Sequence, residues 1–215
     1  MSKQAPIGFV MQGLRKMRPS PRHELHNRNP LELLVATILS AQCTDARVNL
    51  VTPALFKKYR TAKAYAGASL PAFEQEIRST GFYRNKAKNI IAACRIIVER
   101  HGGKVPQTMP ELLELPGVAR KTANIVLSAG FGKTEGIAVD THVMRISQRL
   151  GLTRQKDPNK IEIDLMRLIP RAEWKEVNLL MVLHGRYTCT AKRPQCSKCL
   201  LGRKCPSAFK IKGWR

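Results

Sequence analysis

Residues 111–145 read ELLELPGVARKTANIVLSAGFGKTEGIAVDTHVMR, and the organisation of the chain is clearest in this stretch. Leucines at helical spacing lead up to Pro116 and Gly117, a pair that ends a helix and turns the chain. From Arg120 onward the helical spacing of apolar residues resumes. The stretch therefore predicts a helix, a tight hairpin and a second helix over about residues 111–130.

The turn of this hairpin has the features of a phosphate-binding site. The first amides of a helix lack acceptors within the helix and lie at the positive end of its dipole, which favours an anion. Gly117 has no side chain, so the amides around it, up to Arg120, can approach a phosphate oxygen closely. The hairpin therefore indicates either a grip on a nucleic-acid backbone that reads no bases or an ordinary connection between two helices.

Lys121 and Asp140 are the candidates for catalysis. Lys121 falls in the first turn of the second helix beside Arg120, and both the guanidinium and the helix N-terminus disfavour a protonated amine. A lysine must lose that proton to act as a nucleophile, although most lysines at such positions are only solvated. After a glycine-rich connector, Asp140 or Thr141 is expected to cap another helix, and a carboxylate can cap a helix while also facing a cleft.

The charge balance indicates a polyanionic partner. The 215 residues include 38 Lys and Arg against 15 Asp and Glu, a formal net charge of +23. Such an excess causes self-repulsion in a compact chain, and nucleic acid is the usual partner that offsets it. A membrane is disfavoured because no basic amphipathic anchor is evident and the longest apolar run, residues 33–39, is too short to span a bilayer. The N-terminus has no export signal, so we expect a cytoplasmic, nucleoid-associated protein.

Four of the six cysteines lie within residues 189–205 at the spacing C-x6-C-x2-C-x5-C. In a reducing compartment such clustering indicates metal ligands rather than disulfides. One short loop can wrap four thiolates around a single centre, and the ligands would be Cys189, Cys196, Cys199 and Cys205. Only one C-x2-C pair is present and no histidine lies among the cysteines, so the spacing favours an iron–sulfur cluster over zinc.

The rest of the chain predicts further helices. Asn29 and Pro30 begin a helix whose apolar residues form a core, and Asp45 is expected to cap the next one. Residues 1–22 contain a short amphipathic helix, and other helical runs cover about residues 45–59, 70–80, 84–100, 146–150, 158–169 and 172–187. Because no segment alternates with a period of two, we expect an all-α fold.

The segments LPGVARKTAN (residues 115–124) and VDTHVMR (residues 139–145) resemble the helix-hairpin-helix DNA glycosylases, and most closely the endonuclease III family. The four cysteines match the same family, and the resemblance covers nearly the whole chain. One departure is Ala119, where the family usually has a second glycine. Alanine keeps the amide donor and adds only a methyl group, so we expect a slightly looser phosphate contact.

The resemblance implies two helical domains that flank a cleft. One is a helical barrel, residues 23–135, which contains the hairpin. The other joins residues 1–22 to residues 136–215 and carries a 4Fe-4S cluster on the four cysteines. The implied partner is double-stranded DNA with a damaged base or an abasic site, bound by a monomer.

The implied reaction is that of a bifunctional DNA glycosylase and abasic-site lyase of base excision repair, acting on oxidised pyrimidines. Lys121 attacks C1′ of the sugar as the base leaves, and β-elimination then cuts the strand 3′ to the site. Asp140 stabilises positive charge on the sugar and assists proton transfer from the amine. The residues implied to contact DNA are Gly117, Ala119, Arg120, Gln42, Phe82, His142, Lys192 and Arg193.

Gln42 and Phe82 are the two implied wedges. The resemblance places Gln42 in the space left by an extruded nucleotide, although by position alone it is a polar residue at a helix end. Phe82 stands where the family usually has leucine, and it either stacks on bases or packs against the protein. Arg84, Lys86 and Lys88 follow at once, and they either contact phosphates or form a solvated face.

Two other functions fit part of the sequence. The adenine-removing relatives share the hairpin and the cluster. They normally carry serine at the position of Lys121, a glutamate in the helix that here reads Ala36-Thr37-Ile38, and a further C-terminal domain. A non-catalytic DNA-binding or redox-sensing iron–sulfur protein would tolerate the replacement of Lys121.

Overall fold

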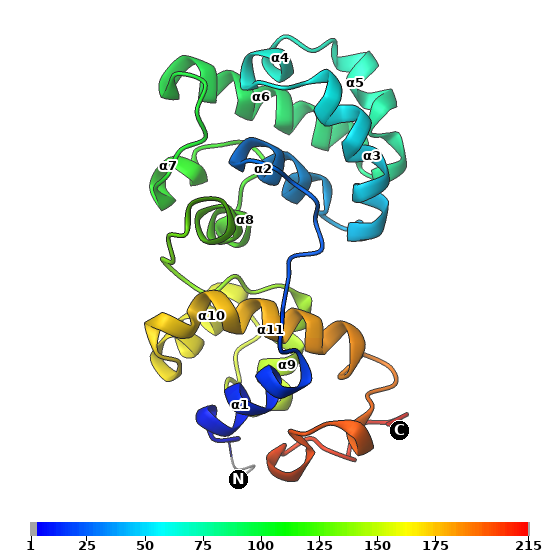
Figure 1. The fold of residues 1–215 in the computed structure, drawn as a ribbon, viewed down its shortest axis with the longest axis vertical. Helices are drawn as coiled ribbons and strands as arrows, with labels where there is room; N and C mark the ends of the chain where they lie inside the picture. Colours follow the sequence, from blue (N-terminus) through cyan, green and yellow to red (C-terminus); the bar gives the residue numbers. More distant parts are fainter. Residues whose placement is uncertain (1–3, 215) are drawn as a thin grey trace. The chain divides into compact units, whose positions relative to one another are not determined.

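The computed structural model describes residues 4–214, which form two compact units (Figure 1). One unit comprises His23–Glu135, and the other joins Met1–Arg22 to Gly136–Arg215. Each unit has a hydrophobic core of its own. Every regular element within residues 4–214 is helical, which confirms the all-α fold expected from the sequence.

The His23–Glu135 unit is built around α2 (Pro30–Leu39) and α6 (Tyr83–His101). Asn29 begins α2 as expected, because its side chain accepts a hydrogen bond from the Glu32 amide at 2.9 Å. The other elements of the unit are α3 (Asp45–Lys58), α4 (Ala62–Ala66), α5 (Leu70–Glu76), η1 (Arg78–Thr80), α7 (Met109–Leu113), α8 (Arg120–Ile125) and a π-helical turn, η2 (Val126–Gly130).

The expected cap of α3 was wrong by one residue. Thr44, not Asp45, caps the helix, and its hydroxyl accepts a hydrogen bond from the Arg47 amide at 3.2 Å. The backbone of Thr44 is extended, as a capping residue requires, whereas Asp45 is already the first residue of the helix. Its carboxylate there complements the positive end of the helix dipole.

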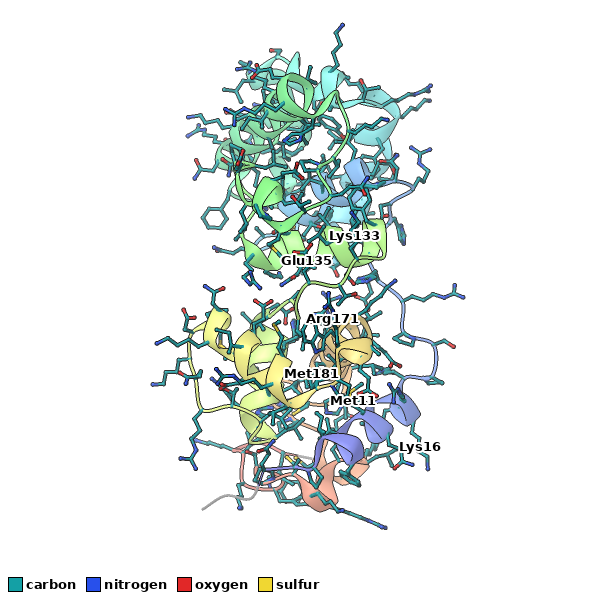
Figure 2. The ribbon with its side chains drawn as sticks, turned by 90° about the vertical axis from the view of Figure 1, so that its left-hand side faces the viewer. Met11, Lys16, Lys133, Glu135, Arg171 and Met181 are labelled. Carbon is teal, nitrogen blue, oxygen red and sulfur yellow. The ribbon has the colours of Figure 1, made fainter. Side chains whose placement is uncertain are left out.

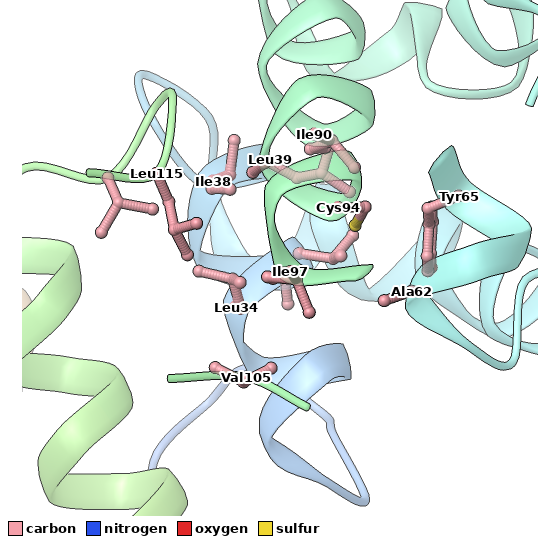
Figure 3. Close-up of a cluster of buried hydrophobic side chains, with 14 of the residues drawn as sticks. Leu34, Ile38, Leu39, Ala62, Tyr65, Ile90, Cys94, Ile97, Val105 and Leu115 are labelled. Carbon is pink, nitrogen blue, oxygen red and sulfur yellow. The ribbon is translucent and has the colours of Figure 1, made fainter. Parts of the chain in front are cut away.

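Figure 3 shows the core between α2 and α6. Leu34 and Leu39 of α2 lie in the same cluster as Ile90 and Ile97 of α6. Cys94 lies on the same apolar stripe of α6, and burial raises the pKa of its thiol to about 12. Cys94 is therefore a buried, inert side chain of the core, set apart from the four cysteines near the C-terminus.

The sequence does not predict α4, because its five residues are too few to show a helical period. Thr61 begins this helix by accepting a hydrogen bond from the Ala64 amide at 3.2 Å. Tyr65 of α4 then stacks on Tyr59, with ring centroids 5.0 Å apart, and Phe73 of α5 meets both rings edge-on. These three rings form an aromatic cluster within the core.

The second unit packs the N-terminal helix, α1 (Ile7–Met17), against α11 (Trp174–Tyr187). Met11 of α1 and Met181 of α11 are both buried in its core (Figure 2). The remaining elements of this unit are α9 (Thr141–Arg149), α10 (Pro158–Leu168), η3 (Arg171–Glu173), η4 (Cys196–Lys198) and η5 (Gly202–Lys204).

A half-exposed ion-pair cluster adds to the contact between α1 and α11. Arg15 of α1 lies 3.1 Å from Glu173 and 2.6 Å from Glu176. Two carboxylates share one guanidinium, which raises the pKa of Arg15.

Within residues 4–214, no helix has the length and apolar character needed to cross a membrane.

Replacement of Phe73 by alanine should lower the free energy of unfolding by about 3–5 kcal/mol, because it leaves a cavity in the aromatic cluster. Leu50→Ala on α3 is the matched control, since its side chain is 72% exposed. For this control we expect a change of about 0.5 kcal/mol or less. Urea denaturation followed by circular dichroism measures both variants, and equal destabilisation would contradict the packing of Phe73.

Candidate active site

The hairpin between α7 and α8 turns at Gly117, whose backbone is left-handed with φ +81°. The Val118 amide closes the turn by donating to the Leu115 carbonyl at 3.0 Å. A Cβ atom at position 117 would lie 2.9 Å from Cβ of Asn89 on α6. Glycine is therefore required both by the backbone conformation and by the close approach to α6. The second reason could not be read from the sequence.

Arg120 and Lys121 occupy the first turn of α8, directly after the hairpin. Ala119 precedes them in an extended conformation, and Lys121 is an exposed side chain. The amides of a first helical turn have no acceptors within the helix. Backbone donors, a guanidinium and an amine thus meet within a few residues at the surface of this unit. The expected second helix continues from α8 into η2.

Asp140 caps α9 in the other unit, as its position in the sequence predicts. Its Oδ1 accepts hydrogen bonds from the amides of His142 and Val143, both at 2.8 Å. Its Oδ2 lies 3.0 Å from Nδ1 of His142, which donates this bond in the tautomer that is protonated at Nδ1. The side chain of Asp140 keeps 16% of its accessible surface. The carboxylate is therefore held in one orientation while part of it still meets solvent.

The chain leading to Asp140 is fixed by a contact that sequence reasoning missed. Asn178 of α11 donates from Nδ2 to the Ala138 carbonyl at 2.5 Å. The two residues are far apart in the sequence, so no local signal could have revealed the bond. This hydrogen bond ties the segment before α9 to α11.

Gln42 and Phe82 share an unusual backbone conformation. Gln42 has φ 52° and Phe82 has φ 47°, both in the left-handed region that residues with a side chain rarely adopt. This conformation costs roughly 1 kcal/mol or more at each residue. Both side chains are exposed, and Phe82 is 63% exposed. The alternative in which Phe82 packs against the protein is therefore wrong for this structure.

Both alternatives considered for Lys86, a phosphate contact and a solvated face, are wrong for this structure. Lys86 is only 4% exposed, and its Nζ donates hydrogen bonds to the carbonyls of Leu39 and Thr80, each at 2.8 Å. A phosphate cannot reach an ammonium that is buried in this way. Arg84 and Lys88, its neighbours in the basic run, are exposed.

The four cysteines near the C-terminus line one common cavity; they are Cys189, Cys196, Cys199 and Cys205. Burial, together with the charges of the three neighbouring cysteines, raises the pKa of Cys199 to about 11. Burial also raises the pKa of Cys205. A bound cation would reverse the effect on Cys199 and Cys205, because it favours the thiolate form of its ligands.

The donor set fits an iron–sulfur cluster. All four donors are sulfur, and apolar side chains such as Ile146 and Leu201 complete the wall of the cavity. No three His, Cys, Asp or Glu side chains within residues 4–214 converge as they would on one metal ion. A set of four cysteines without nitrogen or oxygen donors is one that iron–sulfur clusters use.

Arg149 of α9 holds the cysteine loop in place. Its guanidinium donates to Sγ of Cys189 at 3.2 Å, to the Thr190 carbonyl at 2.8 Å and to the Ala191 carbonyl at 2.9 Å. Arg145, one turn earlier, donates to the Cys189 carbonyl at 3.2 Å. Neither arginine was predicted to hold this loop, although their spacing of four residues places them on one face of a helix.

Lys192 and Arg193 lie in this loop just beyond the residues that Arg149 binds, and both are exposed. The Arg193 amide donates to the Thr190 hydroxyl at 3.3 Å, which shapes the turn. Two cationic side chains are thus presented to solvent on a loop that is fixed at its first cysteine. Such a loop is suited to an anionic backbone.

The chain matches one family model and has near full-length relatives. The model described as "HhH-GPD superfamily base excision DNA repair protein" matches residues 35–171. The endonuclease III of Synechocystis sp. is 56% identical over 207 residues, which cover 96% of this chain and 94% of that protein. The compared sequences therefore share both units, not the hairpin alone.

Two solved structures are also similar to this chain over nearly its full length. A non-covalent endonuclease III–DNA complex has a TM-score of 0.91 and 48% identity, covering 95% of each chain. A trapped covalent endonuclease III–DNA intermediate also has a TM-score of 0.91 and 48% identity, covering 95% of this chain and 96% of that chain.

Gly117→Ala should destabilise the His23–Glu135 unit by about 2–3 kcal/mol. The new Cβ atom would overlap Asn89, and alanine would also have to adopt a left-handed backbone that is unfavourable for it. Gly132→Ala is the matched control: its φ is +69°, but a Cβ atom there would meet no heavy atom within 4 Å. The control carries only the conformational cost of about 1 kcal/mol. Urea denaturation compares the free energy of unfolding of the two variants. An equal loss of stability in both would show that Asn89 does not restrict the side chain at position 117.

Proposed function

We propose a function on the premise that this chain belongs to the HhH-GPD superfamily of base excision DNA repair proteins. The protein is a DNA glycosylase with abasic-site lyase activity, and its partner is DNA. The residue roles rest mainly on one observation, the glycine hairpin that leads directly into the exposed Lys121. The roles and the substrate class below are our proposal.

The proposed substrates are oxidised pyrimidines in double-stranded DNA. The resemblance to endonuclease III supports this class. A base inside a duplex cannot be reached chemically, so the damaged nucleotide must be turned out of the stack. The formal net charge of +23 supports phosphate contacts that do not depend on base sequence.

Lys121 is the nucleophile of the proposed reaction. Its neutral amine attacks C1′ of the sugar, and the new C–N bond forms as the glycosidic bond breaks and the base leaves with the electron pair and a proton. Opening of the sugar ring gives an imine between Lys121 and C1′. Loss of a proton from C2′ then drives β-elimination, which breaks the C3′–O bond. The exposure of Lys121 on its unit supports access to the sugar.

Asp140 assists this step in the proposal. Its carboxylate stabilises positive charge on the sugar and takes up the proton that the attacking amine loses. The hydrogen bonds from the amides of His142 and Val143 keep the carboxylate oriented, so little reorganisation is needed during the reaction. His142, expected to contact DNA, also supports this carboxylate through its ring.

The proposed DNA contacts come from three places. Amides around Gly117, Ala119 and Arg120 bind the phosphate backbone. Gln42 and Phe82 fill the gap left by the extruded nucleotide, and their exposure supports that role. The cysteine loop adds cationic contacts through Lys192 and Arg193.

A 4Fe-4S cluster held by the four cysteines of the C-terminal loop completes the proposal; the ligands are Cys189, Cys196, Cys199 and Cys205. When bound, the cluster supplies a structural cross-link rather than a reacting group. Arg149 donates a charged hydrogen bond to Sγ of Cys189 at 3.2 Å, which holds this ligand in position. The loop that carries Lys192 is then fixed at both ends.

Lys121→Gln should abolish borohydride trapping on abasic DNA and lower strand cleavage by about 10³-fold or more, because glutamine cannot form an imine. The exposed Lys104→Gln variant is the control and should trap as the unaltered protein does. Binding of uncleaved abasic DNA should persist in both variants. If the unaltered protein gives no trapped adduct, the lyase proposal fails, and cleavage by Lys121→Gln at the normal rate would exclude this nucleophile.

The purified protein should contain four irons and four sulfides per chain if the cluster proposal is right. Arg149→Met should lose iron faster under a chelator, by about tenfold, because Cys189 loses a charged hydrogen bond. Arg154→Met, an exposed change in the same unit, serves as the control. Absorbance of the cluster follows the loss, and a stoichiometric zinc ion in place of iron would contradict the proposal.

A further inference from the structure

The two proposed wedge residues lie on two separate segments of the His23–Glu135 unit. Gln42 follows the end of α2 by three residues, and Phe82 immediately precedes α6. Both hold a left-handed backbone, with φ 52° and φ 47°. Residues with side chains keep this conformation only where the surrounding structure imposes it. Contacts from the surrounding structure must therefore hold both segments in this conformation.

Lys86 of α6 contacts both segments at once. Its Nζ donates at 2.8 Å to the carbonyl of Leu39, three residues before Gln42. The same Nζ donates at 2.8 Å to the carbonyl of Thr80, two residues before Phe82. In addition, the Lys86 amide donates to the Phe82 carbonyl at 3.1 Å. One side chain thus ties the end of α2 to the loop before α6.

The burial of Lys86 indicates that these bonds are specific. Its neighbours on α6, Ala87 and Ile90, belong to the hydrophobic core, and Figure 3 shows Ile90 close to Leu39 of α2. An ammonium is costly to bury unless its donors find acceptors, and burial lowers the pKa of Lys86. The Leu39 carbonyl stands at the C-terminal end of α2, where the helix dipole favours a cation.

An apolar side chain at position 86 would pack in the core but would leave the Leu39 and Thr80 carbonyls without this donor. The position therefore favours a long side chain with a charged end. A helix-to-loop link of this kind limits how far the two loops can move apart. It also fixes the backbone just before each strained residue.

We propose that Lys86 is a positioning residue that holds Gln42 and Phe82 as a paired wedge for extrusion of the damaged nucleotide. The inference rests on the proposed function, which gives those two residues the wedge role. Lys86 is buried and acts through the two loops, so that both side chains enter the DNA in a fixed arrangement. Its loss should weaken opening of the base pair more than the chemical step.

The test is Lys86→Met, which keeps the length of the side chain and removes the ammonium. Base removal is measured in single turnover, with enzyme in excess, on two duplexes that carry the same oxidised pyrimidine. The lesion lies opposite a purine in one duplex, and opposite an abasic analogue that cannot pair in the other. A smaller folded fraction lowers both rates alike, whereas a weakened wedge lowers the ratio of the paired rate to the unpaired rate.

We expect Lys86→Met to lower the rate on the paired lesion by about tenfold or more and the rate on the unpaired lesion by less than about threefold. Lys86→Gln keeps a neutral donor, so its effect should be intermediate. The exposed Lys63→Met variant on α4 is the control and should leave both rates unchanged. Combined with Gln42→Ala, Lys86→Met should lower the ratio by a smaller factor than it does alone, because one of the two loops it acts through has then already lost its wedge side chain.

Gln42→Ala and Phe82→Ala separate this inference from the proposed function. If neither variant changes the ratio, the wedge assignment fails and this inference fails with it. If both variants lower the ratio but Lys86→Met does not, the positioning role alone is overturned. The same holds if Lys86→Met lowers the ratio by the same factor in the Gln42→Ala background as in the unaltered protein. Failure of both Lys86 variants to fold would assign Lys86 to the fold alone and would also overturn it.

Discussion

The packing of α6 is the constraint on which the proposed DNA contacts of the His23–Glu135 unit depend. Asn89 of α6 lies against Gly117, so the hairpin can turn only with a glycine at that point. Lys86, less than one turn earlier, binds the segments that lead to Gln42 and Phe82. The apolar stripe of the same helix anchors it in the core. One helix therefore fixes three backbone segments that are distant in the sequence.

The fold could be predicted where a helix carries its own signals. Asn29 begins α2 and Asp140 begins α9, each through a bond to an amide within three residues, and such bonds are visible as local patterns. α4 was missed because it is too short to show a period, and its stability comes from the stacking of Tyr65 on Tyr59. The cap at Thr44 was misplaced by one residue because Asp45 is an equally good capping type.

The candidate site was predicted from motifs, and its supporting residues were not. The hairpin and the cysteine spacing are short patterns whose chemistry can be read directly. Lys86 stands in a basic run that looks solvated, yet it binds the carbonyl of Leu39 across a separation of 47 residues. Arg149 likewise reaches Ala191 from 42 residues away. Long-range hydrogen bonds of this kind depend on the folded chain, so a single sequence gives no warning of them.

The discontinuous unit also determines the order in which a growing chain can form its contacts. α1 is synthesised before the inserted unit, whereas α11, which contributes Met181 to the same core and Glu176 to the ion pair with Arg15, is synthesised after it. The inserted His23–Glu135 unit has all its own residues available before α11 is made, so it is able to fold on the ribosome before the other unit is complete. Completion of the unit that carries the cysteines must await synthesis of the residues that follow Glu135.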